Sequence, residues 1–180
     1  MTAAAAARRL IVLRGNSASG KSSAAAAIRQ RHGERDLAIV SQDNLRRTIL
    51  REHDIPGGAN ISLIEHVARF ALDAGFHVIV EGILHSAHYG PMLRRLMDAH
   101  SPGLSHFYYF DIPFEETLRR HATKPQNVSY GEAEMRKWYR EADLLPGGIE
   151  SIIPVGSSLD STVCRIMTET GLALAAPRSG

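Results

Sequence analysis

The residues with the clearest chemical meaning are eight consecutive ones near the amino terminus, Gly15-Asn16-Ser17-Ala18-Ser19-Gly20-Lys21-Ser22. The two glycines allow the backbone to curl, so that several N–H groups point inward at an anion. In this pattern the lysine can bridge the β- and γ-phosphates, and the hydroxyl of Ser22 can ligate Mg²⁺. The spacing is that of a phosphate-binding P-loop. We therefore expect these residues, together with Ser23, to bind a nucleoside triphosphate.

A second group of candidate residues follows the apolar run Leu37–Val40 and comprises Asp43, Arg46 and Arg47. A carboxylate near the open side of the P-loop can accept the proton of an incoming hydroxyl group, which would make Asp43 the catalytic base. The alternative is that Asp43 caps a helix beginning at Asn44. Either arginine can hold an anionic group of the substrate in a bidentate manner, and a solvated helix face is the alternative for one of them.

Glu81 ends another apolar run and is followed by Gly82, which lets a ligand approach the backbone closely. An acidic residue there can bind Mg²⁺ through water, contact the substrate or act as a base, although an aspartate is more typical of this position. His85 and His88 follow closely. Their spacing does not match a zinc site with a cysteine, so polar surface residues are the simpler interpretation.

A basic cluster ends a predicted helix at Arg119 and Arg120, with Lys124 shortly after. Positive charge near a helix carboxyl terminus commonly stabilises the helix itself. The functional alternative is a lid spanning about 119–137, in which Arg120 neutralises charge on the transferred phosphoryl group and Arg119 contacts the nucleotide. Arg136, on the next predicted helix, is a candidate to join them.

The elements that position these residues alternate between strands and helices. Apolar or β-branched runs predict strands at 10–14, 37–40, 76–80, 106–110 and 152–153. Such alternation predicts right-handed crossovers and a three-layer, doubly wound α/β fold with a parallel five-stranded sheet. In these sheets ligands bind beyond the carboxyl ends of the strands, which is where each candidate residue falls.

Helical patterns fill the intervals between these strands. We expect helices at about 21–32, 44–52, 60–72, 89–97, 113–121 and 132–144, and a last one beginning near 160. Asn60 and Asp160 are the expected caps of the third and last of these helices. Trp138 and Tyr139 are expected to pack against neighbouring helices, and the loop 155–160 is placed to line a purine ring.

The overall composition is that of an ordinary globular domain. The chain has 180 residues, 44% of them hydrophobic and 22% charged, with a net charge of +2. This favours one domain, residues 1–180, with a loose leader at 1–8 and a loose tail at 175–180. No apolar run reaches the roughly 18 residues of a membrane span. The single cysteine, Cys164, excludes an intrachain disulfide, is expected in the core and fits a cytoplasmic location.

Three features together resemble the P-loop kinase superfamily: the P-loop, the step Asp43-Asn44-Leu45-Arg46, and the helix Phe114-Glu115-Glu116-Thr117-Leu118-Arg119-Arg120. The most similar branches are the small kinases grouped with chloramphenicol phosphotransferase, the zeta toxins and the kinase domains of polynucleotide kinases. The resemblance implies strand order 2-3-1-4-5, ATP as donor and Mg²⁺ as cofactor. It also implies that Asp43 is the base, Arg46 contacts substrate, and Arg119 and Arg120 belong to the lid.

These observations predict an ATP-dependent phosphotransferase that acts on a hydroxyl group of a small molecule such as a metabolite, nucleoside or antibiotic. The alternatives are a 5′-hydroxyl nucleic-acid kinase, a zeta-toxin-like sugar-nucleotide kinase and a non-enzymatic, nucleotide-binding regulatory module. The small net charge and the lack of a stripe of basic and aromatic residues count against a nucleic-acid partner. No N-K-x-D element, with which a GTPase recognises guanine, is present. The sequence does not indicate the acceptor or the oligomeric state.

Overall fold

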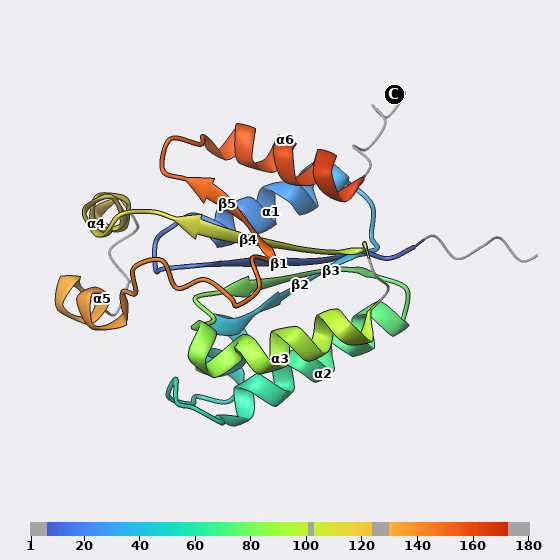
Figure 1. The fold of residues 1–180 in the computed structure, drawn as a ribbon, viewed down its shortest axis with the longest axis horizontal. Coiled ribbons are helices and arrows are strands. Elements are labelled where there is room, and N and C mark those ends of the chain that lie inside the picture. Colours follow the sequence, from blue (N-terminus) through green and yellow to red (C-terminus); the bar gives the residue numbers. More distant parts are fainter. Residues whose placement is uncertain (1–6, 101–102, 124–129, 173–180) are drawn as a thin grey trace, which may run out of the picture.

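The core of the protein is a parallel five-stranded sheet with the order β2-β3-β1-β4-β5 (Figure 1). In the computed structural model, residues 7–100, 103–123 and 130–172 are described. The strands are β1 (Leu10–Gly15), β2 (Leu37–Ser41), β3 (His77–Gly82), β4 (Ser105–Asp111) and β5 (Glu150–Pro154). The predicted doubly wound fold and its strand order are confirmed.

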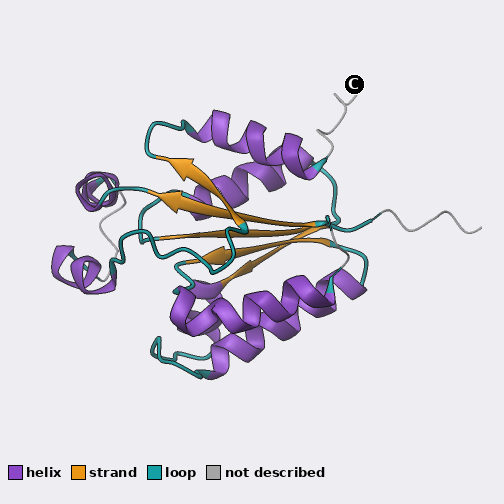
Figure 2. Cartoon of the chain, viewed as in Figure 1, coloured by secondary structure: helices purple, strands orange, loops and turns teal. Residues whose placement is uncertain are grey.

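Helices cover both faces of this sheet (Figures 1 and 2). One face carries α1 (Lys21–His32) and α6 (Leu159–Thr170), and the other carries α2 (Ala59–Asp73) and α3 (Ser86–Ala99). Two further helices, α4 (Phe114–Ala122) and α5 (Glu132–Trp138), lie beyond the carboxyl end of β4. None of the described helices is long and apolar enough to cross a membrane.

The alternation of side chains along β1 explains the two-sided core. Leu10 and Val12 pack into the cluster beneath α2 and α3, whereas Ile11 and Leu13 pack into the cluster beneath α1 and α6. All four are fully buried, as expected for the central strand of a parallel sheet. This burial holds rigidly the strand from which the P-loop emerges.

Both predicted helix caps are wrong, because other side chains satisfy the first N–H groups. Asn60 is buried inside α2, and the carboxylate of Glu52 accepts hydrogen bonds from the Ala59 and Asn60 N–H groups at 2.7 and 2.8 Å. At α6 the cap is Ser158, whose hydroxyl accepts a hydrogen bond from Ser161 N. Asp160 instead lies in the first turn.

Two other expectations also fail. The helix predicted for 132–144 ends at Trp138, because Tyr139 is extended and the following backbone is bound by the P-loop. Cys164 is exposed, since its neighbours Val163 and Ile166 take the buried face of α6. The predicted helix at 44–52 is a short π-helix, η1 (Asn44–Ile49), of a kind often found at functional sites.

Gly82 at the end of β3 provides a test of the packing around the site. A Cβ atom at this position would lie 2.6 Å from Gln42 Cβ and 2.4 Å from Gln42 Oε1. Gln42 is itself held, because its Oε1 accepts a hydrogen bond from Leu84 N at 3.1 Å. We predict that Gly82→Ala lowers the free energy of unfolding by about 1–3 kcal/mol, measured by urea denaturation.

Gly156→Ala is the matched control, because nothing lies within 4 Å of a Cβ atom at that position. We expect the urea denaturation midpoint of Gly156→Ala to stay near that of the wild type. Equal denaturation midpoints for the two variants would show that Gln42 does not constrain Gly82.

Candidate active site

The P-loop connects β1 to α1, and its backbone encloses the lysine head group. Gly20 has φ 105°, a left-handed conformation that favours glycine, and α1 begins at the next residue. Lys21 is buried, and its Nζ donates to Asn16 O at 2.7 Å and Ser19 Oγ at 3.1 Å. The ammonium group therefore lies within the loop, beside the helix amino terminus, where an anion is favoured.

Ser22 and Glu81, the two predicted Mg²⁺ ligands, lie side by side. The Ser22 hydroxyl donates to Glu81 Oε2 at 2.8 Å, because β3 runs next to β1 in the sheet and brings its last residues to the P-loop. Glu81 is 5% exposed, whereas Ser22 faces solvent at the mouth of the loop. Hydroxyl and carboxylate oxygens are the hard donors that Mg²⁺ prefers, so this pair fits that cation.

Of the two predicted lid arginines, the structure brings Arg120 to the P-loop and leaves Arg119 in solvent. Arg120 Nη1 donates to Ser19 O at 3.0 Å, while the Arg119 side chain is 71% exposed. Glu116 binds both guanidinium groups, Arg119 first and then Arg120, and these hydrogen bonds lower its pKa to about 2. Lys124 lies outside the described residues, and Arg136 pairs with Glu132 and packs over Phe114.

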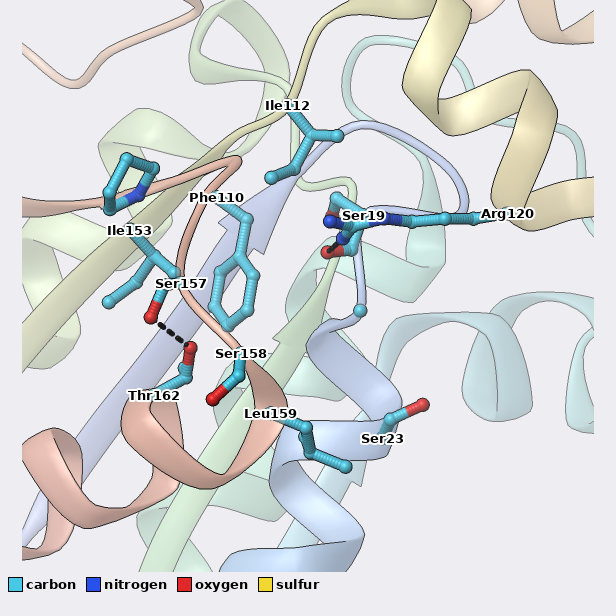
Figure 3. Close-up of a pocket in the computed structure, with 12 residues that line it drawn as sticks. Ser19, Ser23, Phe110, Ile112, Arg120, Ile153, Ser157, Ser158, Leu159 and Thr162 are labelled. Atoms are coloured by element: carbon cyan, nitrogen blue, oxygen red, sulfur yellow. Dashed lines mark hydrogen bonds between the residues drawn. The ribbon is translucent and has the colours of Figure 1, made fainter.

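A cavity of about 290 Å³ adjoins the P-loop on the β4–β5 side of the sheet (Figure 3). Its floor is apolar, with Phe110 and Ile153 from the strand ends. Ser157 and Ser158 from the loop before α6, and Leu159 at the start of that helix, line its edge. Arg120 reaches across its mouth toward Ser19 (Figure 3). The predicted purine-lining loop therefore borders a cavity next to the phosphate loop.

Asp43 lies two residues after β2, on the opposite side of the P-loop from this cavity in the strand order. It occupies the N-cap position of η1 but makes no capping hydrogen bond. Its carboxylate instead contacts Arg46 at 3.4 Å and Arg47 at 3.2 Å and is 64% exposed. The three residues that the sequence proposed for the acceptor side are thus together.

No pattern in the sequence indicated the buried charge at Arg14. This residue of β1 is 0% exposed, and its guanidinium group contacts Leu84 O at 2.9 Å, Glu150 at 2.7 Å and Asp143 at 3.0 Å. A buried charge is tolerated only when it is fully paired. Arg14 thereby links the strand that carries the P-loop to three other segments: the β3–α3 loop, the segment after α5 and the start of β5.

Asn16 makes a second connection between the P-loop and the segment after α5. Its side-chain amide donates to Arg140 O at 2.8 Å and accepts from Arg140 N at 2.9 Å. Tyr130 lies close as well, with its hydroxyl 3.2 Å from Ser17 Oγ. These contacts join residues more than one hundred positions apart, and such contacts produce no periodic pattern in the sequence. Only the general tendency of loop asparagines to bond to backbone groups could have suggested them.

A group of potential metal ligands also exists at the other edge of the sheet, formed by His32, Asp36 and His77. Arg8 pairs with Asp36 at 2.9 Å, and His77 Nδ1 accepts a hydrogen bond from Arg9 N at 3.0 Å. A histidine that binds a metal normally donates a hydrogen bond from its other ring nitrogen, which this backbone contact prevents. The group is therefore best described as a structural ion pair.

Comparison with known families gives one match, to a family described as AAA domain, over residues 10–143. No curated protein matches the sequence.

Solved structures share the fold at low sequence identity. An unliganded sugar kinase from Janibacter sp. HTCC2649 is 18% identical, with a TM-score of 0.67 over 92% of this chain and 96% of that one. The Mycobacterium tuberculosis APS kinase, in complex with AMPPNP and APS, is 21% identical, with a TM-score of 0.65 over 92% and 98%. A gluconokinase from Sinorhizobium meliloti 1021 is 17% identical, with a TM-score of 0.64 over 91% of each chain.

The pairing of Asp143 predicts how stability depends on pH. Burial alone would raise the pKa of this carboxyl group, but the His85 ring, the Ser86 donors and the Arg14 charge lower it from 3.8 to about 2. Because the folded-state pKa is lowered, the stabilisation is present above pH about 4 and is lost as the pH falls toward 2. We predict that Asp143→Asn reduces the free energy of unfolding by about 2–4 kcal/mol at pH 7.

The measurement is urea denaturation of wild type and variant from pH 7 to pH 2.5, with the exposed carboxylate variant Asp98→Asn as control. The difference between wild type and Asp143→Asn should narrow below about pH 4. A difference that is constant across this range would contradict the assignment of the stabilisation to the ionised carboxylate.

Proposed function

Since the chain belongs to the AAA-domain family and has the fold of a P-loop kinase, we propose that it transfers the γ-phosphoryl group of ATP to a hydroxyl group of a small molecule. The observation that carries this proposal is the presence of two cavities on opposite sides of the P-loop strand. One, of about 290 Å³, follows β4 and β5 and includes P-loop residues. The other, of about 300 Å³, is lined by residues that follow β2 and β3 and by residues at the end of α5. A transferase needs two such sites that meet at the phosphates.

The first cavity suits the donor nucleotide. Its apolar floor accepts a base, and its wall includes Ser19 and Gly20 of the P-loop. The N–H groups of the loop, the buried Lys21 and the Arg120 guanidinium then face the phosphates. Fixed positive groups of this kind stabilise the charge that develops on the transferred group.

In the transfer step the acceptor oxygen bonds to the γ-phosphorus while the bond from that phosphorus to the β–γ bridging oxygen breaks, releasing ADP. The acceptor proton passes to the Asp43 carboxylate, which Arg46 and Arg47 orient. Such transfer depends mainly on positioning and charge neutralisation. Ser22 and Glu81 are the residues that would hold Mg²⁺, which supplies charge neutralisation at the β- and γ-phosphates when bound.

The size of the second cavity bears on the alternative functions. A volume of about 300 Å³ lies at the lower end of the range for small-molecule sites and suits one or two rings rather than a polymer. It therefore favours a small acceptor over a nucleic-acid 5′ end. A regulatory module without catalysis would bind nucleotide without turnover, which the following experiment detects.

We predict that Asp43→Asn lowers kcat by about 10²- to 10⁴-fold, because the acceptor loses its proton acceptor. The measurement is phosphorylation of a panel of hydroxylated metabolites, antibiotics and nucleosides, with ATP as donor. Nucleotide affinity should stay near that of the wild type, since Asp43 lies on the acceptor side. A near-normal rate for Asp43→Asn would show that this residue is not the base, and absence of turnover with every acceptor would favour the regulatory module.

Adjacent arginines provide a matched test of the donor side. Arg120 contacts Ser19 O, whereas Arg119 contacts only Glu116 within the described residues. We predict that Arg120→Met lowers kcat by about 10- to 10³-fold, while Arg119→Met changes it by less than about 3-fold. Steady-state kinetics with saturating ATP measure both effects. Equal losses would indicate that the lid rearranges to bring Arg119 to the phosphates.

A further inference from the structure

The second cavity is strongly basic. Four of the side chains that line it carry a permanent positive charge: Arg46, Arg47, Lys137 and Arg140. Three histidines also line the cavity, and Asp54 is the one carboxylate of the lining among the described residues. Since the whole chain has a net charge of only +2, this concentration of charge is local. It favours an anion in the cavity.

The carboxylate of Asp54 is already engaged by the protein. The Tyr89 hydroxyl lies 2.8 Å from Asp54 Oδ1, and Gln42 Nε2 donates to Oδ2 at 3.4 Å. Burial raises the pKa of Tyr89, so the hydroxyl keeps its proton and remains a donor. Asp54 is consequently held in the wall, and among the described residues it forms no ion pair with any of the four cations.

Arg46 is buried without adequate compensation. It is 9% exposed, and its guanidinium group contacts Glu52 O at 3.2 Å and Asp43 Oδ1 at 3.4 Å, both long. Its Nε has no hydrogen-bond partner among the described residues. A guanidinium group has five N–H donors, and leaving them unpaired in a buried position is costly. An oxyanion in the cavity would satisfy them.

Arg47 is oriented for the same purpose by two aromatic rings. Its guanidinium carbon lies 5.3 Å from the Tyr130 ring centroid and 5.4 Å from that of Trp138. The two rings pack edge to face at 5.1 Å. Cation–π contacts fix the guanidinium group through its face and leave N–H edges available for a bidentate anion. Trp138 therefore lines the cavity and orients Arg47.

We propose that the phosphate acceptor is itself an anion: a small hydroxylated molecule that carries a carboxylate or phosphate group, bound by Arg46 and Arg47. This inference rests on the proposed phosphotransferase function. With the anionic group at the arginines, the hydroxyl is presented to Asp43, which contacts both of them. The cavity volume of about 300 Å³ accommodates one ring or a short chain with its anionic group.

The test uses sets of molecules that differ only in the anionic group: glucose, glucuronate and glucose 6-phosphate; glycerol, glycerate and glycerol 3-phosphate; adenosine and its monophosphates. Binding to the protein with ADP and Mg²⁺ is measured by calorimetry. In at least one set, the anionic member should bind about 10- to 100-fold more tightly than the neutral one. The preferred group within that set distinguishes a carboxylate from a phosphate.

Arg46→Met and Arg47→Met should each remove most of this preference and leave ADP affinity unchanged. Because Arg46 is buried, Arg46→Met could destabilise the fold; Arg46→Lys, which keeps the charge, and Arg47→Met, at a less buried position, provide independent tests. Thermal melting checks that each variant is folded. Arg35→Met is the control for net charge, because Arg35 is exposed and precedes the amino end of β2, whereas the basic cavity lies beyond the carboxyl end of that strand. It should preserve the preference.

Two results would overturn the proposal: no anionic member binds more tightly than its neutral counterpart, or the preference survives both Arg46→Met and Arg47→Met. Phosphorylation assays on the same sets separate this proposal from the one on which it rests. Anion binding that depends on these arginines without phosphoryl transfer would contradict the phosphotransferase and support the anion site. If neutral and anionic members were bound and phosphorylated equally well, the result would support the phosphotransferase and contradict the anion site.

Discussion

The buried guanidinium group of Arg14 is the constraint on which the geometry of the site depends. A charge with no exposed surface must find its partners within the protein, and Arg14 finds them in three segments distant in sequence. Leu84 O belongs to the loop after β3, Asp143 to the segment after α5, and Glu150 to β5. The segment after α5 is also bonded to the P-loop, because the Asn16 side chain pairs with the Arg140 backbone. The positions of the three segments are therefore set by one residue of the strand from which the loop emerges.

The backbone shows the consequence of this arrangement. Leu84 and Ala142 both have φ 46°, in the left-handed region that non-glycine residues rarely occupy. Leu84 O accepts from Arg14, and Ala142 directly precedes Asp143. Strain of this kind, of the order of 1 kcal/mol or more at each residue, persists only where the surrounding structure fixes it. At these two positions the pairing of Arg14 provides the compensating interaction.

The sequence predicted the fold well, because the strands and helices follow from local patterns, and the prediction of the P-loop rests on a pattern of the same local kind. The apolar strands, the alternation with helices and the spacing from Gly15 to Ser22 each have a recognisable signature within a short window. The failures at the start of α2 and the end of α5 share a physical cause, which is competition from a residue outside the local sequence window. Glu52 displaces Asn60 as the cap of α2, and the bonds from Asn16 to Arg140 accompany the end of α5 at Trp138. The partners of Arg14 could not be predicted, since contacts over 70 to 136 positions have no periodic signal.

The chain between β4 and β5 contributes lining residues to both cavities. Arg120, from α4, borders the cavity next to the P-loop, whereas Lys137, Trp138 and Arg140 line the basic cavity. Both parts are bonded to the P-loop itself, Arg120 through Ser19 O and Arg140 through Asn16. Because the same connection between β4 and β5 supplies cations to the two cavities, a movement of α4 and α5 together would change the positive charge in both cavities. The residues that we propose to neutralise the donor and those that we propose to hold the acceptor are thereby connected through the phosphate loop between them.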